Sequence, residues 1–195
     1  MKKYLIVLVF VMSTFLIESC SAPTTVTSWS DPVFKGKQFK KILVLALVKN
    51  FDFRKAYENQ IALNLTKEGV NAVNSVTVFN FEKKYSAEEL GKSLQDGNYD
   101  GLLIVKYLET DVNKRIHPAV SFYDYYWGGI SVFSRPGYYE SHKTVKMEVS
   151  LFSPQSKTPV WYATTKTWDA SGIDDLSSSL AKEVTADIKE SGFIK

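Results

Sequence analysis

Apolar residues gather into blocks with two kinds of spacing along the first seventy residues. Ile42 to Val48 is an unbroken apolar run, which is typical of a strand buried on both faces of a sheet. The next apolar positions recur every four residues and predict one buried face of a helix: Phe53, Tyr57, Ile61 and Leu65. Gly69 follows as a helix terminator. The pattern therefore predicts a central strand followed by a helix packed on its sheet.

Two more strands and a short helix follow. A second strand is expected from Val70 to Phe79. Ser86 and Glu89 have the spacing of a capping box, which predicts the start of a helix that runs to Gln95. Tyr99 to Glu109 has an apolar centre and is expected to be the third strand. Because helices connect these three strands, we expect them to pair in parallel.

The end of the chain has a different pattern. Apolar and polar residues alternate from Lys143 to Phe152, which predicts a strand with one buried face, and Val160 to Trp168 is its expected hairpin partner. Four apolar residues spaced by four then predict a final helix: Leu176, Leu180, Val184 and Ile188. The expected fold class is α/β (α+β). It is a mixed sheet of about five or more strands, with a βαβαβ unit, then an antiparallel hairpin and a carboxy-terminal helix.

An aromatic segment separates these two parts of the chain. Eight aromatic side chains lie between 122 and 139: Phe122, Tyr123, Tyr125, Tyr126, Trp127, Phe133, Tyr138 and Tyr139. Tyr and Trp combine a large apolar area with a polar tip, so they suit protein interfaces and the faces of sugars. Our hypothesis is that Tyr125, Tyr126 and Trp127 form an exposed surface that binds a partner. The alternative is that the segment forms strands and packs on the sheet.

The first twenty residues indicate where the protein is located. Lys2 and Lys3 precede an apolar run from Tyr4 to Ile17, which is shorter than the roughly twenty residues of a membrane span. Cys20 follows directly after this signal. The order of basic, apolar, small and cysteine residues resembles a bacterial lipoprotein signal, although Glu18 departs from the usual pattern. The resemblance implies cleavage before Cys20 and acylation of this residue. An ordinary cleaved signal and an uncleaved anchor are the alternatives.

These features define the expected domain organisation. Residues 1–19 are a signal peptide, residues 20–28 a lipidated tether, and residues 29–195 a single globular α/β domain. The tether is small and polar and contains Pro23, which is typical of a flexible linker. No Asp follows Cys20 to indicate retention in the inner membrane. We therefore expect a lipid anchor in the outer membrane of a bacterium, on the periplasmic face.

Charge and cysteine content narrow the classes of partner. The formal net charge is +3, and loss of Lys2, Lys3 and Glu18 lowers it to +2, which is too weak to indicate nucleic acid binding. Cys20 is the only cysteine, so no intrachain disulfide can form. Four lysines form a cluster: Lys35, Lys37, Lys40 and Lys41. The cluster either contacts anionic head groups or the cell-wall polymer, or it is a solvated segment that leads into a strand.

The sequence lacks the motifs of the common catalytic sites. It contains no Gly-x-Ser-x-Gly nucleophile elbow, no phosphate-binding GxxxxGK[ST] loop and no GxGxxG. The two histidines, His117 and His142, are far apart and have no cysteine beside them, so we expect neither a metal nor a cofactor. Glu109 and Asp111 end a predicted strand, where α/β active sites often lie. Together with Asp124, they are the candidates for acid–base catalysis.

Residues 40–69 resemble the opening of a group of envelope lipoprotein domains. The group comprises the curli secretion channel, the activators of penicillin-binding proteins and the amino-terminal domain of the Tol β-propeller protein. The matching positions are the strand Ile42–Val48 and four residues of the following helix and its end: Arg54, Glu58, Leu65 and Gly69. Residues 160–168 and the last helix resemble the end of the same domains. The resemblance implies a binding or assembly module, and some of its members form rings.

These observations lead to one expected function and two alternatives. We expect a membrane-anchored, periplasm-facing lipoprotein that acts as a non-enzymatic binding or assembly module of the cell envelope. Its expected partners are the membrane, through Cys20, and an envelope protein or another copy of itself. One alternative is an enzyme that acts on cell-wall glycan or lipid through the strand-end carboxylates. The other is a structural lipoprotein that forms rings.

Overall fold

A single mixed sheet forms the centre of the protein in the computed structural model. The structure describes residues 22–80, 86–117, 120–126, 129–135, 138–154, 156 and 158–195. Six strands pair in the order β1-β8-β7-β4-β2-β3. Their bounds are β1 (Thr24–Ser30), β2 (Lys41–Leu47), β3 (Asn71–Asn74), β4 (Gly101–His117), β7 (Tyr138–Phe152) and β8 (Trp161–Trp168). A separate two-stranded sheet consists of β5 (Val120–Tyr126) and β6 (Gly129–Arg135).

The strand directions confirm the predicted fold class. β2 lies parallel to both β3 and β4, as expected for strands joined by helices. β7 is antiparallel to β4 and to β8, so the predicted hairpin of residues 143–152 and 160–168 is present. The sheet is therefore mixed, and a helix follows its last strand.

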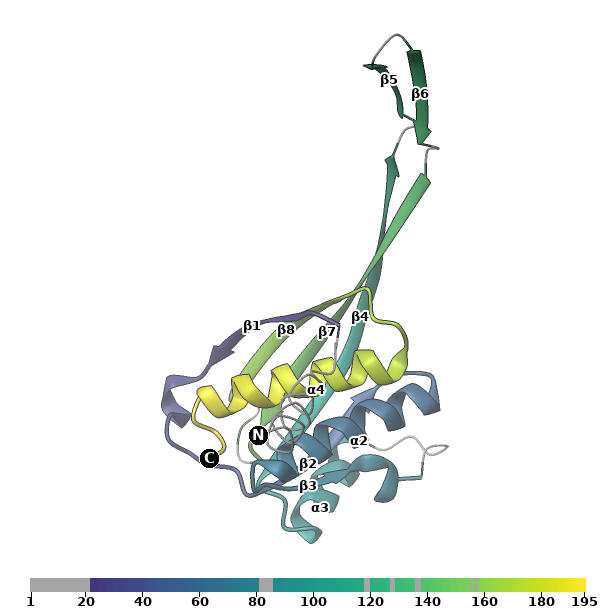
Figure 1. Cartoon of the computed structure of the whole chain (residues 1–195). Coiled ribbons are helices and arrows are strands. Elements are labelled where there is room, and N and C mark those ends of the chain that lie inside the picture. Colours follow the sequence, from purple (N-terminus) through teal and green to yellow (C-terminus); the bar gives the residue numbers. More distant parts are fainter. Residues whose placement is uncertain are drawn as a thin grey trace, which may run out of the picture.

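Helices cover the two faces of the sheet unequally (Figure 1). α2 (Phe51–Lys67) and α4 (Ile173–Glu190) pack side by side on one face, and the shorter α3 (Ala87–Asp96) packs on the other face near β2 and β4. Two 3-10 turns complete the elements, η1 (Pro32–Phe34) and η2 (Ser75–Thr77). Among the helices that the structure describes, none combines the length and the apolarity that a membrane span requires.

The larger core lies between the sheet and the pair α2 and α4. Both predicted helix faces contribute to it, although Phe53 is exposed. The predicted face positions that are buried are Tyr57, Ile61, Leu65, Leu180, Val184 and Ile188. Trp161 of β8 is fully buried, and its indole Nε1 donates a hydrogen bond of 2.8 Å to Asp187 Oδ1 of α4. This bond satisfies the one polar atom of a large core side chain.

β2 is buried on both faces, as its unbroken apolar run predicts. Ile42 and Val44 belong to the larger core, whereas Leu43 belongs to a smaller cluster with Leu94 and Leu102 beneath α3. The capping box that begins α3 is also confirmed. Glu89 N donates to Ser86 Oγ at 3.2 Å, and Ser86 N donates to Glu89 Oε2 at 2.9 Å.

Predicted boundaries are wrong at the second strand and at the tether. The second strand ends at Asn74 instead of Phe79, because the chain turns into η2, where it bonds to a buried carboxylate of α2. The flexible tether predicted over residues 20–28 is also too long. Residues 24–28 belong to β1, which pairs with β8 along its whole length, so the ordered body begins before Trp29. Cys20 lies outside the described residues.

Candidate functional site

β4 and β7 continue as a pair far beyond the rest of the sheet (Figure 1). The last pair between β7 and β8 is Thr144 with Trp168, whereas β4 and β7 stay paired from there to His117 and Tyr138. We call the projecting part, residues 112–117 of β4 paired with 138–143 of β7, the ribbon. Past its root, neither strand pairs with a third one among the described strands. Apart from Lys143, whose backbone bonds to Asp169, the outer edges of the ribbon are therefore not covered by another described strand.

The two faces of the ribbon differ in chemistry. Side chains alternate between the faces of a strand, so the register assigns each residue to one face. Val112, Ile116 and Tyr139 share one face, and Ile116 and Tyr139 are 69% and 78% exposed. Lys114, Ser141 and Lys143 lie on this same face, which we call the apolar face. The opposite face carries polar and charged residues and one tyrosine: Asn113, Arg115, Tyr138, Glu140 and His142.

A histidine lies between two carboxylates at the root of the ribbon. His142 Nδ1 lies 2.6 Å from Asp169 Oδ2, and His142 Nε2 lies 3.3 Å from Glu140 Oε1. Asp169, which directly follows β8, also accepts a hydrogen bond of 2.7 Å from Lys143 N. The bond to Asp169 raises the pKa of His142, and the nearby Glu140 adds to this effect. The bonds from His142 and Lys143 lower the pKa of Asp169.

Lys146 binds the strand-end carboxylates that the sequence offered for catalysis. A register shift between Tyr107 and Glu109 places Glu109 opposite Lys146. Lys146 Nζ lies 2.6 Å from Glu109 Oε1 and 2.8 Å from Asp111 Oδ2, and these bonds raise the pKa of the lysine. The carboxylates therefore form an exposed ion triad that joins β4 to β7.

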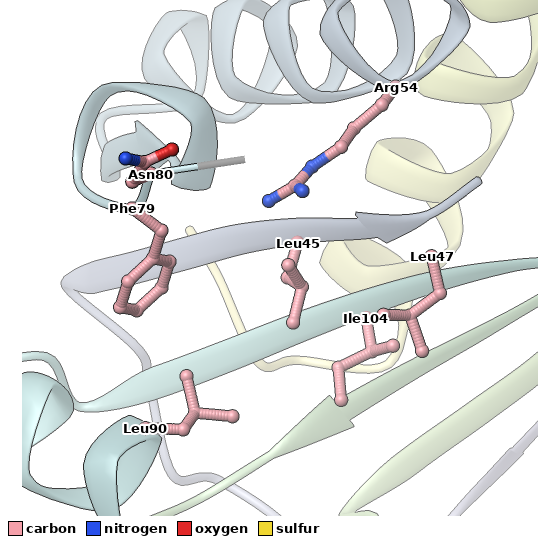
Figure 2. Close-up of a pocket in the computed structure, with 7 residues that line it drawn as sticks. All are labelled: Leu45, Leu47, Arg54, Phe79, Asn80, Leu90 and Ile104. Carbon is pink, nitrogen blue, oxygen red and sulfur yellow. The ribbon is translucent and has the colours of Figure 1, made fainter. Parts of the chain in front are cut away.

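A small cavity lies on the sheet face that α3 partly covers (Figure 2). Its volume is about 320 Å³, and its lining is largely aliphatic and aromatic: Leu45, Leu47, Phe79, Leu90 and Ile104, with Arg54 and Asn80 at the side. Figure 2 shows that the guanidinium of Arg54 points from α2 toward this space. The cavity suits a small apolar group better than a charged substrate.

The side chain of Arg54 is held by a buried carboxylate. Glu58 is fully buried, and its Oε1 accepts hydrogen bonds from Ala46 N at 2.9 Å, Arg54 Nε at 2.9 Å and Ser75 Oγ at 2.7 Å. Its Oε2 accepts a bond of 2.9 Å from Val76 N. Glu58 thus joins β2, α2 and η2. The spacing of Arg54 and Glu58 suggests a surface pair, but the acidic partner lies in the interior.

The other site predictions fall on or near the ribbon. Tyr125 and Tyr126 lie in β5, which follows the ribbon, and Figure 1 shows β5 and β6 as the part farthest from the body. Trp127 and Cys20 lie outside the described residues. His117 and His142 lie on different strands of the ribbon. Within the described ranges, no group of three or more His, Cys, Asp or Glu residues could hold a metal ion.

The sequence interpretation missed the ribbon, because the sequence signal for it is weak. Val112 and Ile116 are four residues apart, so both fall on one face of a strand, but Lys114 lies between them on that face. β4 continues to His117, past the predicted end of the third strand at Glu109.

Comparisons with known proteins identify the fold alone. No protein-family model matches the chain, and no curated protein matches it. Among solved structures, a PelC variant from Paraburkholderia phytofirmans, described as a dodecamer, is 16% identical with a TM-score of 0.50. The match covers 84% of this chain and 96% of that one. The lipoprotein GNA1162 from Neisseria meningitidis is 15% identical with a TM-score of 0.44, covering 77% of this chain and 99% of that one.

Proposed function

We propose that this chain is a lipoprotein anchored in the outer membrane through Cys20, facing the periplasm, that acts as a non-enzymatic assembly module of the cell envelope. The single observation that carries the proposal is the ribbon. A two-stranded ribbon is marginally stable alone in water, because it lacks a third strand or a helix to cover it. Its exposed apolar face, and edges that no other described strand covers, therefore favour a role in binding.

A second copy of the chain is the partner we propose for the ribbon edges. Strand edges bind other strands through backbone hydrogen bonds, which require no particular side chains on the partner. Identical ribbons projecting from neighbouring copies can pair in this way. The similarity to PelC adds support, because that protein of related fold is described as a dodecamer.

The ion triad supports the non-enzymatic part of the proposal. An acid–base pair needs carboxylates that face a substrate. Here Glu109 and Asp111 both bind Lys146, at 2.6 Å and 2.8 Å, so one lysine holds both carboxylates. The carboxylates therefore serve to join the two strands at the base of the ribbon.

Removal of the ribbon tests the proposal. Replacing residues 112–143 by Asn-Gly joins Asp111 to Thr144, which are already paired, through a two-residue hairpin turn. No residue of 112–117 or 138–143 belongs to the buried core, so the body should keep its circular dichroism spectrum. The acylated full chain should elute as an oligomer by size-exclusion chromatography with light scattering. The variant without the ribbon should elute as a monomer.

Two controls make this result specific. Lys182→Ala changes an exposed lysine of α4 and should leave the oligomer intact. Crosslinking in intact cells should give the same multiples of the chain mass as the purified protein. An unchanged mass without the ribbon would show that other surfaces hold the copies together.

A further inference from the structure

The chain enters the body at the end of the sheet from which the ribbon leaves. The register pairs Thr24 of β1 with Thr167 of β8. The next residue of β8, Trp168, lies opposite Thr144 at the root of the ribbon, and its backbone N donates to Pro23 O at 3.0 Å. The start of β1 and the root of the ribbon therefore lie at the same end of the sheet.

Ala22 is fixed on α4 at this end. Its backbone N donates to Asp175 Oδ1 at 2.8 Å, and its carbonyl accepts a bond from Ser179 Oγ. Only Ser21 separates Ala22 from Cys20. Since an extended chain spans at most about 3.6 Å per residue, an acylated Cys20 stays within about 7 Å of Ala22. The anchor thus holds the ribbon end of the body against the membrane.

The apolar face of the ribbon lies on the same side of the sheet as Ala22 at the root. By alternation along β7, Tyr139 shares its face with Val145 and Met147, which pack in the core against the side covered by α2 and α4. Ala22 bonds to α4 on that side. The lipid anchor and the apolar face therefore both lie on the side of the sheet that α2 and α4 cover.

The charges of the two ribbon faces fit a lipid surface. The apolar face carries Lys114 and Lys143 beside its exposed apolar residues, and it carries no acidic residue. Lysine stems lie along apolar surface while their ammonium groups reach anionic phosphates. The acidic residues at the root of the ribbon lie on or beside the opposite face, where Glu140 and Asp169 join His142 and where Glu109 and Asp111 bind Lys146.

From this arrangement we infer that the ribbon lies along the surface of the membrane that holds the anchor, with Val112, Ile116 and Tyr139 toward the lipid. The inference rests on the proposed function, because it requires a chain anchored at Cys20. The ribbon stays in the head-group region, since its unpaired edge groups need water or another strand. Its edges remain available to neighbouring copies.

The segment beyond the ribbon has the composition of a membrane-surface element. Residues 120–135 include Phe122, Tyr123, Tyr125, Tyr126, Trp127 and Phe133, and their only charged residues are Asp124 and Arg135. Tyr and Trp concentrate at membrane–water interfaces, where the ring is apolar and the polar tip reaches water. The partner of the aromatic segment is then a lipid surface.

The lysine cluster lies away from this surface. Lys41 pairs with Asn71 of β3, and its neighbour Ile42 pairs with Gly101 of β4, at the opposite end of the sheet from the ribbon root. Lys37 Nζ donates to Ser153 Oγ at 2.7 Å, and Lys41 Nζ donates to Gly97 O at 2.7 Å. These contacts hold the two side chains on the body, which argues against the head-group contact considered for the cluster.

Site-directed labels on opposite ribbon faces test the inference. Cys20 is the only cysteine and is acylated in the proposed form, so a single introduced cysteine accepts a fluorescent label without competition. Ile116→Cys and Tyr139→Cys place the label on the apolar face, and their neighbours Arg115→Cys and Glu140→Cys place it on the other face. The acylated full chains are reconstituted into vesicles of phosphatidylethanolamine and phosphatidylglycerol with brominated acyl chains.

We expect quenching by brominated lipid to be roughly threefold or more stronger on the apolar face than on the charged face. Quenching by aqueous iodide should show the reverse order. Equal quenching of neighbouring labels would overturn the inference. So would an apolar face that is protected from iodide but not quenched by brominated lipid, because protein would then cover it.

Mass spectrometry of the amino-terminal peptide separates this inference from the proposed function. A peptide without acyl groups on Cys20 overturns both. An acylated chain with equal quenching on the two ribbon faces overturns only the inference about the lipid surface. An acylated monomer with the expected face difference overturns self-association and leaves the inference in place.

Discussion

β4 and β7 pass through two environments along one continuous pairing. In the body, Val105 and Val149 lie opposite each other and are fully buried. Beyond the root, Ile116 and Tyr139 lie opposite each other and are mostly exposed. The alternation of side chains is the same in both parts. The difference is that helices cover the body, whereas the ribbon projects beyond them (Figure 1).

The same two strands therefore divide into a buried part that stabilises the fold and an exposed part that we propose binds a partner. In the body, burial of apolar side chains stabilises the fold by about 25 cal/mol per Å² of apolar surface. In the ribbon, the exposed side chains contribute little to folding and remain available for a partner. Substitutions in the body should therefore lower the free energy of unfolding, whereas substitutions in the ribbon should change association and leave stability nearly unchanged.

The largest effect on stability is expected at Trp161. Trp161→Ala removes a fully buried ring and leaves Asp187 without its indole donor, so it should lower the free energy of unfolding by about 4 kcal/mol. Urea denaturation followed by circular dichroism measures this change. Trp29→Ala is the matched control, because Trp29 is half exposed on β1 and should change stability by less than about 0.5 kcal/mol. Equal effects of the two would contradict the assigned core.

Glu58 should give the next largest effect. Glu58→Gln places amide hydrogens among four donors and removes the charge that balances Arg54, so it should cost about 3 kcal/mol. The same denaturation experiment measures it. Glu183→Gln on α4, whose carboxylate is 3.9 Å from Lys182 on the surface, is the control and should be nearly neutral. A neutral Glu58→Gln would show that the buried network does not hold β2, α2 and η2 together.

The root of the ribbon should loosen as the pH rises. The pKa of His142 is raised by Asp169, so its contribution is complete below the unfolded value of about 6.5 and is lost as the pH passes the folded value. The pKa of Asp169 is lowered, so its contribution is present above its unfolded value and is lost when the pH falls through the folded one. The interaction between His142 and Asp169 is therefore strongest at pH values between the folded pKa of Asp169 and the folded pKa of His142.

Hydrogen exchange measures this dependence. The amide of Lys143, which donates to Asp169, should exchange faster relative to its intrinsic rate as His142 loses its proton. The amide of Val149 in the core should not change over the same range. His142→Asn should remove the pH dependence at Lys143. A dependence that persists in this variant would assign the effect to another group.

The smallest effect on stability is expected on the ribbon. Tyr139→Ser and Tyr138→Ser change neighbouring exposed residues on opposite ribbon faces and should each alter the free energy of unfolding by less than about 0.5 kcal/mol. They should differ in binding: Tyr139→Ser should weaken association of the acylated chain with vesicles more than Tyr138→Ser. Salt-dependent flotation measures this difference. A large loss of stability in Tyr139→Ser would place this residue in the fold instead.

Local spacing was sufficient to predict most of the body. The four-residue repeats of α2 and α4 arise because one face of each helix meets the sheet, and the unbroken run of β2 arises because both its faces are covered. These patterns depend on neighbours in sequence, so they can be read without the fold. The end of β3 could not be predicted, because it depends on Glu58, which is far from Val76 in the sequence.

The candidate site was predicted only in part. The aromatic residues indicated the segment that follows the ribbon, but not that two strands would carry it away from the body. Pairing between β4 and β7 joins residues far apart in the chain, and alternation alone does not state whether a helix will cover a strand. The beginning of β1 was likewise hidden, because its small polar residues are also typical of a flexible linker.

The sequence by itself determined most elements of the body and their order, since each of these leaves a local pattern. Only the tertiary structure decided that Glu58 is buried, that Ala22 is fixed beside the root of the ribbon and that β4 and β7 project together. Each of these results depends on contacts between residues distant in sequence. The physical reason is that burial and position follow from packing, and packing is set by the whole chain.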